Sequence, residues 1–266
     1  MNGLSHVNVE LTSRCNKSCA ICGRRKRERE HPELCNYGDM DLDMVGAISS
    51  QLPGGVFVQL HNNGEPLLYP YLRDALRLFE WNYTGFDTNG ILILERMDEI
   101  IDLLNTITFS VVANDEHGKK QFNDVSRFLA LKGARKPLTT IRFSGDIEPD
   151  REMAWEDLAN HFSIQIARRI LHAKEMSREY QRRPVVPEIG VCLEILHKLS
   201  IDRFGNVSPC VRFDPEGINR LGNVAEQSLH SIWNGKKRRE WVDYHLAGLR
   251  HNVPLCAICE YWGIPQ

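Results

Sequence analysis

Three cysteines near the start of the chain constrain this sequence more than any other feature. Cys15, Cys19 and Cys22 place three thiols within eight residues, directly after a segment, His6–Leu11, that alternates as a strand does. Cysteine thiolates at short spacings are the usual ligands of iron–sulfur clusters, and three of them leave one iron of a four-iron cube open to a small molecule. The alternative is a zinc site with a distant fourth ligand, although zinc sites favour paired CxxC elements.

Length and charge exclude several classes of protein. The 266 residues suffice for one sizeable core, or for one main domain with a small appendage. A net charge of −2 gives no basic field for nucleic acid or for a membrane surface. No apolar run approaches the roughly 20 residues that span a bilayer, and the first residues lack a signal-peptide pattern. We therefore expect a cytoplasmic protein with no nucleic-acid or membrane partner.

Eight cysteines are many for a reducing compartment, where disulfides are disfavoured and clustered thiols indicate metal binding or catalysis. Seven of them fall into two groups at opposite ends of the chain, and Cys35 stands alone. The segregation predicts two separate metal sites. The second group consists of Cys192, Cys210, Cys256 and Cys259.

The first two-thirds of the chain alternate between short apolar runs and amphipathic segments. This pattern predicts an α/β fold with a parallel sheet, in which chemistry gathers at the carboxyl ends of the strands. About six strands are too few for a closed eight-stranded barrel, so we expect an open, partial (β/α)6 barrel resembling a TIM barrel. The expected strands are 6–11, 56–60, 83–88, 107–113, 139–144 and 162–166, and the expected helices are 41–52, 71–81, 94–104, 120–131 and 150–160.

The character of the sequence changes after this region. Residues 173–188 are polar and contain prolines, which indicates a linker or mobile segment between a barrel of residues 1–172 and a smaller domain of residues 189–266. The strands 199–202 and 207–211 flank Phe204-Gly205-Asn206 and predict a hairpin, and one helix is expected over Ser228–Tyr244. The basic run Arg24–Glu30 predicts a solvated segment, because its glutamates dilute any anion-binding field.

Three further segments follow the cysteine loop along the chain: Asn63-Gly64-Glu65-Pro66, Asp87-Thr88-Asn89-Gly90, and Ser110 on the next strand. With the CxxxCxxC loop they resemble the radical S-adenosylmethionine (SAM) superfamily, whose members bind SAM at the open iron of a [4Fe–4S] cluster. The sequence departs from the family pattern at Ile21, where an aromatic residue is usual, and at Asn63, which replaces a glycine. The resemblance implies that Cys15, Cys19 and Cys22 ligate the cluster, and that Asn63, Gly64, Glu65, Pro66, Thr88, Asn89 and Ser110 contact SAM.

The second cysteine group has its own resemblance. Four thiolates can ligate an iron–sulfur cluster completely, and they also suit structural zinc. The spacing from Cys192 through Gly205 to Cys210, followed by Cys256-Ala-Ile-Cys259, resembles the SPASM/Twitch extensions of radical SAM enzymes. The short Twitch form, a β-hairpin plus helix, fits best and implies one auxiliary [4Fe–4S] cluster. The implied cofactors are thus two [4Fe–4S] clusters and SAM, with a flavodoxin- or ferredoxin-type protein as reductant.

The resemblance also implies a reaction. A fully ligated auxiliary cluster can accept an electron from a substrate radical, which favours oxidation of a carbinol carbon. Overall size and C-terminal spacing are most similar to those of the 2-deoxy-scyllo-inosamine dehydrogenases, so the expected partner is a small carbohydrate or cyclitol. The alternatives are a redox-neutral epimerase with Cys35 as hydrogen donor, a peptide maturase, and an iron–sulfur or zinc interaction module. Arg142, near the end of a strand, and Arg212, just after Cys210, are candidate substrate contacts.

Overall fold

The computed structural model describes residues 1–113, 115–169, 191–211, 214 and 217–259. Six parallel strands form most of one sheet, in the order β6-β5-β4-β3-β2-β1. The order follows the chain, as expected for successive βα units, and β1 does not return to β6, so the barrel is open. The predicted partial barrel is therefore confirmed. Its strands are β1 (His6–Val9), β2 (Phe57–Gln59), β3 (Tyr83–Thr88), β4 (Thr106–Val112), β5 (Leu138–Ser144) and β6 (Gln165–Arg169).

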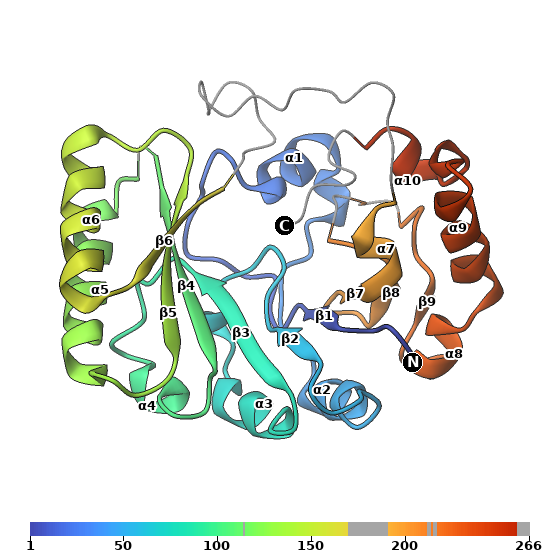
Figure 1. The fold of residues 1–266 in the computed structure, drawn as a ribbon, viewed down its shortest axis with the longest axis horizontal. Coiled ribbons are helices and arrows are strands. Elements are labelled where there is room, and N and C mark those ends of the chain that lie inside the picture. The colour runs from blue at the N-terminus through green and yellow to red at the C-terminus, as the bar shows by residue number, and fades with distance from the viewer. Residues whose placement is uncertain (114, 170–190, 212–213, 215–216, 260–266) are drawn as a thin grey trace.

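The connecting helices lie along the outer side of the curved sheet (Figure 1). Their apolar stripes explain this placement: helix α5 buries Val125, Phe128 and Leu129. Phe109 of β4 meets Phe128 edge to face, with ring centroids 5.8 Å apart. These helices are α2 (Leu42–Ser49), α3 (Leu72–Leu78), α4 (Met97–Ile100), α5 (Gly118–Lys132) and α6 (Pro149–Phe162).

The inner side of the barrel is polar. Successive side chains of a strand point to opposite faces. One face of β3, β4 and β5 buries apolar side chains, namely Phe86, Ile107, Phe109, Val111, Ile141 and Phe143. The alternate positions, which are only partly buried, carry polar groups. They include Asp87 on β3, Thr108 and Ser110 on β4, and Thr140 and Arg142 on β5. A polar inner face is suited to bind a hydrophilic molecule.

The C-terminal part joins the same sheet. Strand β7 (Lys198–Ile201) pairs in parallel with β1, and β8 (Asn206–Ser208) and β9 (Gly222–Asn223) follow antiparallel. The predicted hairpin is present, and Gly205 makes its turn with a φ of +80°. Buried Ile201, Val207 and Trp233 belong to the same apolar core as Val7 and Val9. The cysteine-bearing C-terminal part is therefore packed against the barrel through a continuous sheet and core.

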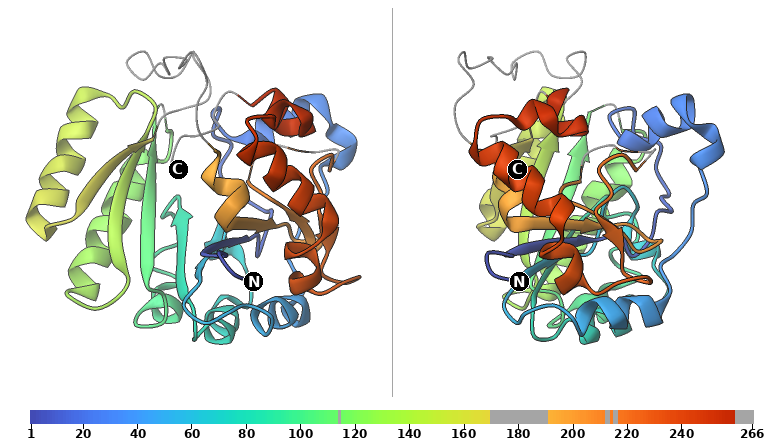
Figure 2. Two further views of the ribbon diagram at one scale, coloured as in Figure 1. Left: turned by 45° about the vertical axis from the view of Figure 1, so that its right-hand side comes forward. Right: turned by 90° about the vertical axis from the view of Figure 1, so that its right-hand side faces the viewer.

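Helices α7 (Leu193–His197), α8 (Leu229–Trp233), α9 (Lys236–Leu246) and α10 (Pro254–Ala257) stand beside these strands (Figure 2). The expectation of a single helix over Ser228–Tyr244 was wrong, because α8 ends at Asn234 and Gly235 caps α9. Single-turn 3-10 helices occur at Pro32–Leu34, Pro66–Leu68 and Arg250–Asn252. Residues 173–188, expected to be a linker, lie outside the described residues. None of the described helices combines the length and apolar character needed to cross a membrane.

Two other expectations need correction. The predicted helix 94–104 is helical only over α4, and Asp102 adopts a φ of 65°, which ends the segment. The basic run expected to be solvated is instead helix α1 (Gly23–Glu30), and Arg24 within it is buried. The pattern gave no sign of this helix because it contains no apolar residue.

Candidate active site

The loop that carries Cys15, Cys19 and Cys22 leaves the carboxyl end of β1 and runs into helix α1. Its conformation is fixed by backbone contacts: the Cys22 N–H donates to the Cys19 carbonyl at 3.1 Å, and the Lys17 N–H donates to the Cys15 sulfur at 3.4 Å. Burial raises the pKa of the Cys19 thiol to about 11; the Lys17 ammonium opposes this rise, and the thiols of Cys22 and Cys15 add to it. The three thiols are therefore close enough to interact electrostatically.

A buried ion pair holds this loop against the barrel. The Lys17 ammonium donates to the carboxylate of Asp115, which follows β4, and their side chains are only 3% and 6% exposed. Arg151 of α6 lies 3.8 Å from the same carboxylate. Sequence reasoning missed Lys17 and Asp115, because the two residues are 98 positions apart and neither belongs to a motif.

The Asn63–Pro66 segment packs directly against the strand that leads into the cysteine loop. A Cβ atom at Gly64 would lie 1.9 Å from the Thr12 carbonyl oxygen, so only glycine permits this approach of two backbones. The Asn63 N–H donates to Glu10 at 3.3 Å, and Pro66 begins the following 3-10 helix. The predicted SAM segment and the cysteine loop are thus neighbours.

Glu65 joins the second predicted SAM segment to the first. Its carboxylate accepts hydrogen bonds from the Thr88 hydroxyl at 2.7 Å and from the Asn89 N–H at 2.8 Å. The Leu67 N–H donates to the same carboxylate at 3.1 Å. Burial raises the pKa of Glu65, and the donors from Asn89, Thr88 and Leu67 oppose that rise. Glu65 therefore fixes the loops that follow β2 and β3 relative to each other.

Ser110 and Arg142 lie side by side on neighbouring strands, because β4 and β5 pair in that register. Gln121 of α5 donates to the carbonyls of Ser110 at 2.8 Å and Asn89 at 2.9 Å, which places these two predicted SAM contacts next to each other. The structure brings together most of the sequence-predicted SAM residues. Their contacts with SAM remain a prediction.

Arg142 belongs to a charged unit on the inner face. Its guanidinium pairs with the carboxylate of Asp87 on β3, and His61 Nε2 lies 3.6 Å from the same carboxylate. The Asp87 N–H donates to His61 Nδ1 at 3.1 Å, so the neutral imidazole carries its hydrogen on Nε2. All three side chains are less than a third exposed. Sequence reasoning missed His61 and placed Asp87 only in the segment that resembles the SAM ribose contact, although both lie at the carboxyl end of a strand, where barrel chemistry gathers.

The four distal cysteines also approach one another. Cys192 caps α7, Cys210 follows β8, Cys256 lies in α10 and Cys259 follows it. Burial raises the pKa of the Cys256 thiol to about 12, and the nearby thiols of Cys210, Cys192 and Cys259 add to the rise, while Arg250 opposes it. Arg212 lies outside the described residues.

Cys35 occupies a different position, after the 3-10 helix Pro32–Leu34. Its thiol donates to the His31 carbonyl at 3.6 Å, and its sulfur lies 3.6 Å from the Tyr37 hydroxyl oxygen. Tyr37 in turn donates to Glu28 of α1 at 2.9 Å. These contacts tie Cys35 to helix α1, and its role as hydrogen donor remains a prediction.

All seven clustered thiols are partly buried, three in one group and four in the other. Thiolate sulfur is the usual ligand of iron–sulfur clusters and also suits structural zinc, so the donor sets fit either kind of site.

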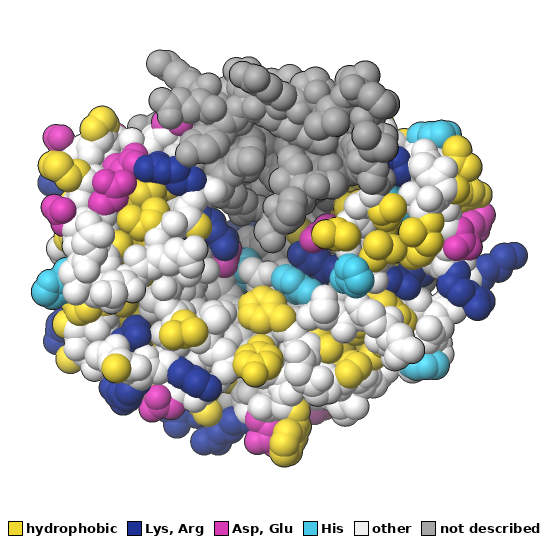
Figure 3. Space-filling view, in the orientation of Figure 1, with side chains coloured by type: hydrophobic (Ala, Val, Ile, Leu, Met, Phe, Trp, Pro, Cys, Tyr) yellow, Lys and Arg dark blue, Asp and Glu magenta, His cyan; other side chains and the backbone are white. Residues whose placement is uncertain are grey.

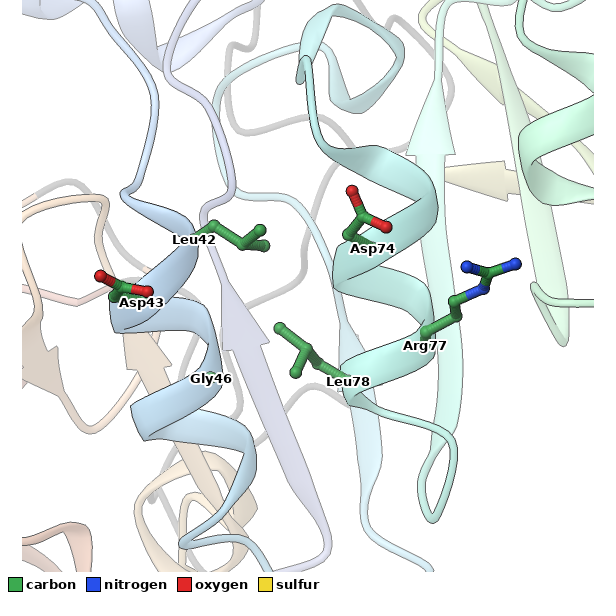
Figure 4. Close-up of a pocket in the computed structure, with 6 residues that line it drawn as sticks. All are labelled: Leu42, Asp43, Gly46, Asp74, Arg77 and Leu78. Carbon is green, nitrogen blue, oxygen red and sulfur yellow. The ribbon is translucent and has the colours of Figure 1, made fainter.

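The inner face and the outer helical layer differ in character. Charged and histidine side chains gather around the middle of the face seen in Figure 3. A groove between α2 and α3 on the outside is lined by Leu42, Asp43, Gly46, Asp74, Arg77 and Leu78 (Figure 4). None of its lining residues is a predicted site residue, so it does not compete with the inner face as the reaction site.

Comparisons with known proteins agree with this geometry. Residues 192–260 match the SPASM family, an iron–sulfur cluster-binding domain. The chain is 24% identical over 268 residues to the S-adenosyl-L-methionine-dependent 2-deoxy-scyllo-inosamine dehydrogenase of Niallia circulans, which covers 96% of this chain and 92% of that protein. The crystal structure of BtrN in complex with AdoMet and 2-DOIA matches 97% of this chain and 93% of that one, with a TM-score of 0.60 and 19% identity. Residues 192–260 are thus an iron–sulfur cluster-binding domain of the SPASM type, and the chain as a whole is similar to a SAM-dependent dehydrogenase.

Structures of SuiB from Streptococcus suis share the fold. Streptococcus suis SuiB bound to S-adenosylmethionine matches 97% of this chain and 72% of that chain, with a TM-score of 0.62 and 15% identity. SuiB bound to a precursor peptide matches 88% and 65% with a TM-score of 0.60. The predicted fold class is confirmed, and the two [4Fe–4S] clusters and SAM are confirmed as the cofactors of this class of protein.

Proposed function

We propose that this radical SAM enzyme oxidises a carbinol carbon of a small hydroxylated substrate of the sugar or cyclitol class. The similar protein that spans nearly the whole chain is named as a SAM-dependent dehydrogenase of an aminocyclitol. When bound, the cofactors supply a 5′-deoxyadenosyl radical that removes a hydrogen atom, and a second cluster that accepts an electron. We assign residues 1–172 to the first task and residues 189–266 to the second.

The observation that carries the substrate class is the charged unit on the inner face. Asp87 is held between Arg142 and His61, and Arg142 lies beside Ser110, a predicted SAM contact. A carboxylate with two fixed donors is an acceptor for a hydroxyl group, and the Arg142 guanidinium offers further donors to a polyol. An apolar substrate would gain nothing from this face.

The same unit suggests where the hydroxyl proton goes. Oxidation of a carbinol to a ketone removes one hydrogen atom from carbon, one electron, and the proton of the hydroxyl group. His61 cannot accept that proton on Nε2, because its Nδ1 is occupied by the Asp87 N–H and Nε2 already carries a hydrogen. The Asp87 carboxylate is therefore the proposed acceptor, and Arg142 and His61 are the groups that orient it.

The cysteine groups support the electron path. Strand β7, which belongs to the C-terminal part with the four distal cysteines, pairs with β1, the strand that precedes the loop of Cys15, Cys19 and Cys22. The two cysteine groups are therefore attached to one sheet. We propose that Cys192, Cys210, Cys256 and Cys259 hold the accepting cluster, and that a flavodoxin- or ferredoxin-type protein reduces the first cluster. The assignment of SAM contacts to Gly64, Glu65, Asn89 and Ser110 belongs to the same proposal.

Anaerobic turnover tests the proposal. The reconstituted protein is mixed with reductant, SAM and a panel of aminocyclitols and sugars, and 5′-deoxyadenosine and substrate mass are followed. A substrate that loses two mass units while 5′-deoxyadenosine forms supports dehydrogenation. A product of unchanged mass in ordinary water that gains one deuterium in deuterated water supports epimerisation instead. The Cys35→Ala variant then decides whether the Cys35 thiol is the hydrogen donor. A modified peptide in place of a modified polyol overturns the substrate class.

A further inference from the structure

Arg24 is a buried cation without a sufficient partner among the described residues. It follows Cys22 by two positions in helix α1, and its side chain is 8% exposed. Its Nε and NH1 atoms are inaccessible to water and have no hydrogen-bond partner in the described structure. Burying a guanidinium without a compensating anion is strongly unfavourable. Its position therefore calls for a negative group that the polypeptide itself does not provide.

The nearest acid does not meet this need. Glu28 lies 4.0 Å from the Arg24 guanidinium, at the limit of an ion pair. Its carboxylate already accepts from Arg25 at 2.6 Å and from the Tyr37 hydroxyl at 2.9 Å. Arg24 stacks instead on the Tyr37 ring, 4.0 Å from its centroid, which leaves the edges of the guanidinium for another acceptor.

The cysteine loop runs directly into the helix that carries Arg24. Cys22 is the N-cap of α1, and Arg24 is the second residue of that helix. A [4Fe–4S] cube held by three thiolates has a net charge of about −1, and about −2 after reduction, and hydrogen bonds to its sulfurs and nearby charge set its potential. The cluster thus has the sign of charge and the acceptor sulfurs that the guanidinium lacks.

We propose that Arg24 is a positioning residue for the first cluster: its guanidinium donates to the sulfurs around Cys15 and Cys22 and stabilises the reduced state. This inference rests on the proposed cluster at Cys15, Cys19 and Cys22. Tyr37 holds the guanidinium from its other face, and Glu28 with Arg25 holds Tyr37. The assembly makes the first cluster easier to reduce than it would be beside a neutral side chain.

The test compares Arg24→Met, which removes the charge at similar length, with Arg24→Lys, which keeps the charge but loses the planar fork. Arg29→Met is the matched control, because Arg29 lies in the same helix, carries the same charge, is 68% exposed and pairs with Glu30, outside the assembly around Arg24. The full-length protein is reconstituted anaerobically, and the midpoint potential of each cluster is measured by EPR-monitored titration without SAM. A Cys15/Cys19/Cys22→Ala variant identifies the signal of the C-terminal cluster.

The expected result is a more negative potential for the first cluster in Arg24→Met, a smaller shift in Arg24→Lys, and no change in Arg29→Met or in the C-terminal cluster. If Arg24→Met is folded by circular dichroism but loses four irons that Arg24→Lys retains, the inference is also supported. An unchanged potential in Arg24→Met, or an equal shift in Arg29→Met, overturns it. An unchanged potential with weakened SAM binding assigns Arg24 to SAM and also overturns it. Failure of the wild-type protein to bind the first cluster refutes the proposed function instead.

Discussion

The Lys17–Asp115 ion pair gives the sharpest prediction about stability. Replacing Lys17 by Met keeps the length of the side chain but leaves the Asp115 carboxylate, 6% exposed, without its main partner. Breaking a buried pair in this way costs about 3–5 kcal/mol. Arg151, 3.8 Å away, offsets part of the loss, so we expect the lower end, about 3 kcal/mol. At roughly 2–4 °C per kcal/mol, the melting temperature should fall by about 6–12 °C.

The assay is thermal unfolding of the full-length protein without clusters, followed by circular dichroism under anaerobic, reducing conditions. Lys120→Met is the control, because Lys120 forms a pair with Asp124 but is 53% exposed, and such pairs contribute less than about 1 kcal/mol. The double variant Lys17→Met/Asp115→Asn should recover much of the loss, because no uncompensated charge remains. If Lys17→Met melts within a degree or so of Lys120→Met, the buried pair does not exist and the reasoning fails.

Three other substitutions test the inner face and the neighbouring loops. Gly64→Ala should abolish SAM binding or folding, because its Cβ would meet the Thr12 carbonyl, whereas Gly54→Ala, with ordinary contacts, should behave as wild type in SAM-binding calorimetry. Asp87→Asn should lower product formation at least tenfold while SAM cleavage continues uncoupled; full coupling in this variant would contradict the proposed role. Burial raises the pKa of Glu10, so the folded state binds the proton of this carboxyl more tightly than the unfolded state does. The protonated carboxyl contributes its full stability below pH 4.5. That contribution is lost as the pH rises through the pKa of Glu10 in the folded state. Glu10→Gln should therefore lose less stability than wild type as the pH rises above 4.5 in urea titrations, and parallel curves would rule out the shift.

The barrel strands were predictable, because each is a short apolar run bounded by a turn, and parallel pairing follows from the intervening helices. Helix α1 was not, because its stability comes from charge pairs and from contacts of Arg24 with Tyr37, which no periodicity reports. The join of β7 to β1 was also hidden, since it links residues that are about 190 positions apart. The sequence alone can locate the strands, but it cannot identify which strands pair when they lie so far apart in the chain.

In the candidate site, too, local motifs were predictable and contacts between distant residues were not. Motif spacing identified the cysteines and the Gly64-Glu65-Pro66 segment, since their chemistry demands those residues in that order. The link from Glu65 to Thr88 was not visible, because it depends on the close approach of two loops. The unit of His61 and Asp87 was missed for a similar reason: each is an ordinary polar residue until strand register places it beside Arg142.

The central claim is that the cysteine loop after β1 holds a cluster that cleaves SAM. The most direct test measures 5′-deoxyadenosine formed by the anaerobically reconstituted protein with dithionite and SAM, together with its iron content. We predict about eight irons per chain and steady formation of 5′-deoxyadenosine. A Cys15/Cys19/Cys22→Ala variant should retain about four irons and form none. A fully loaded wild-type protein that never forms 5′-deoxyadenosine, or a colourless protein with two zinc ions, would contradict the account.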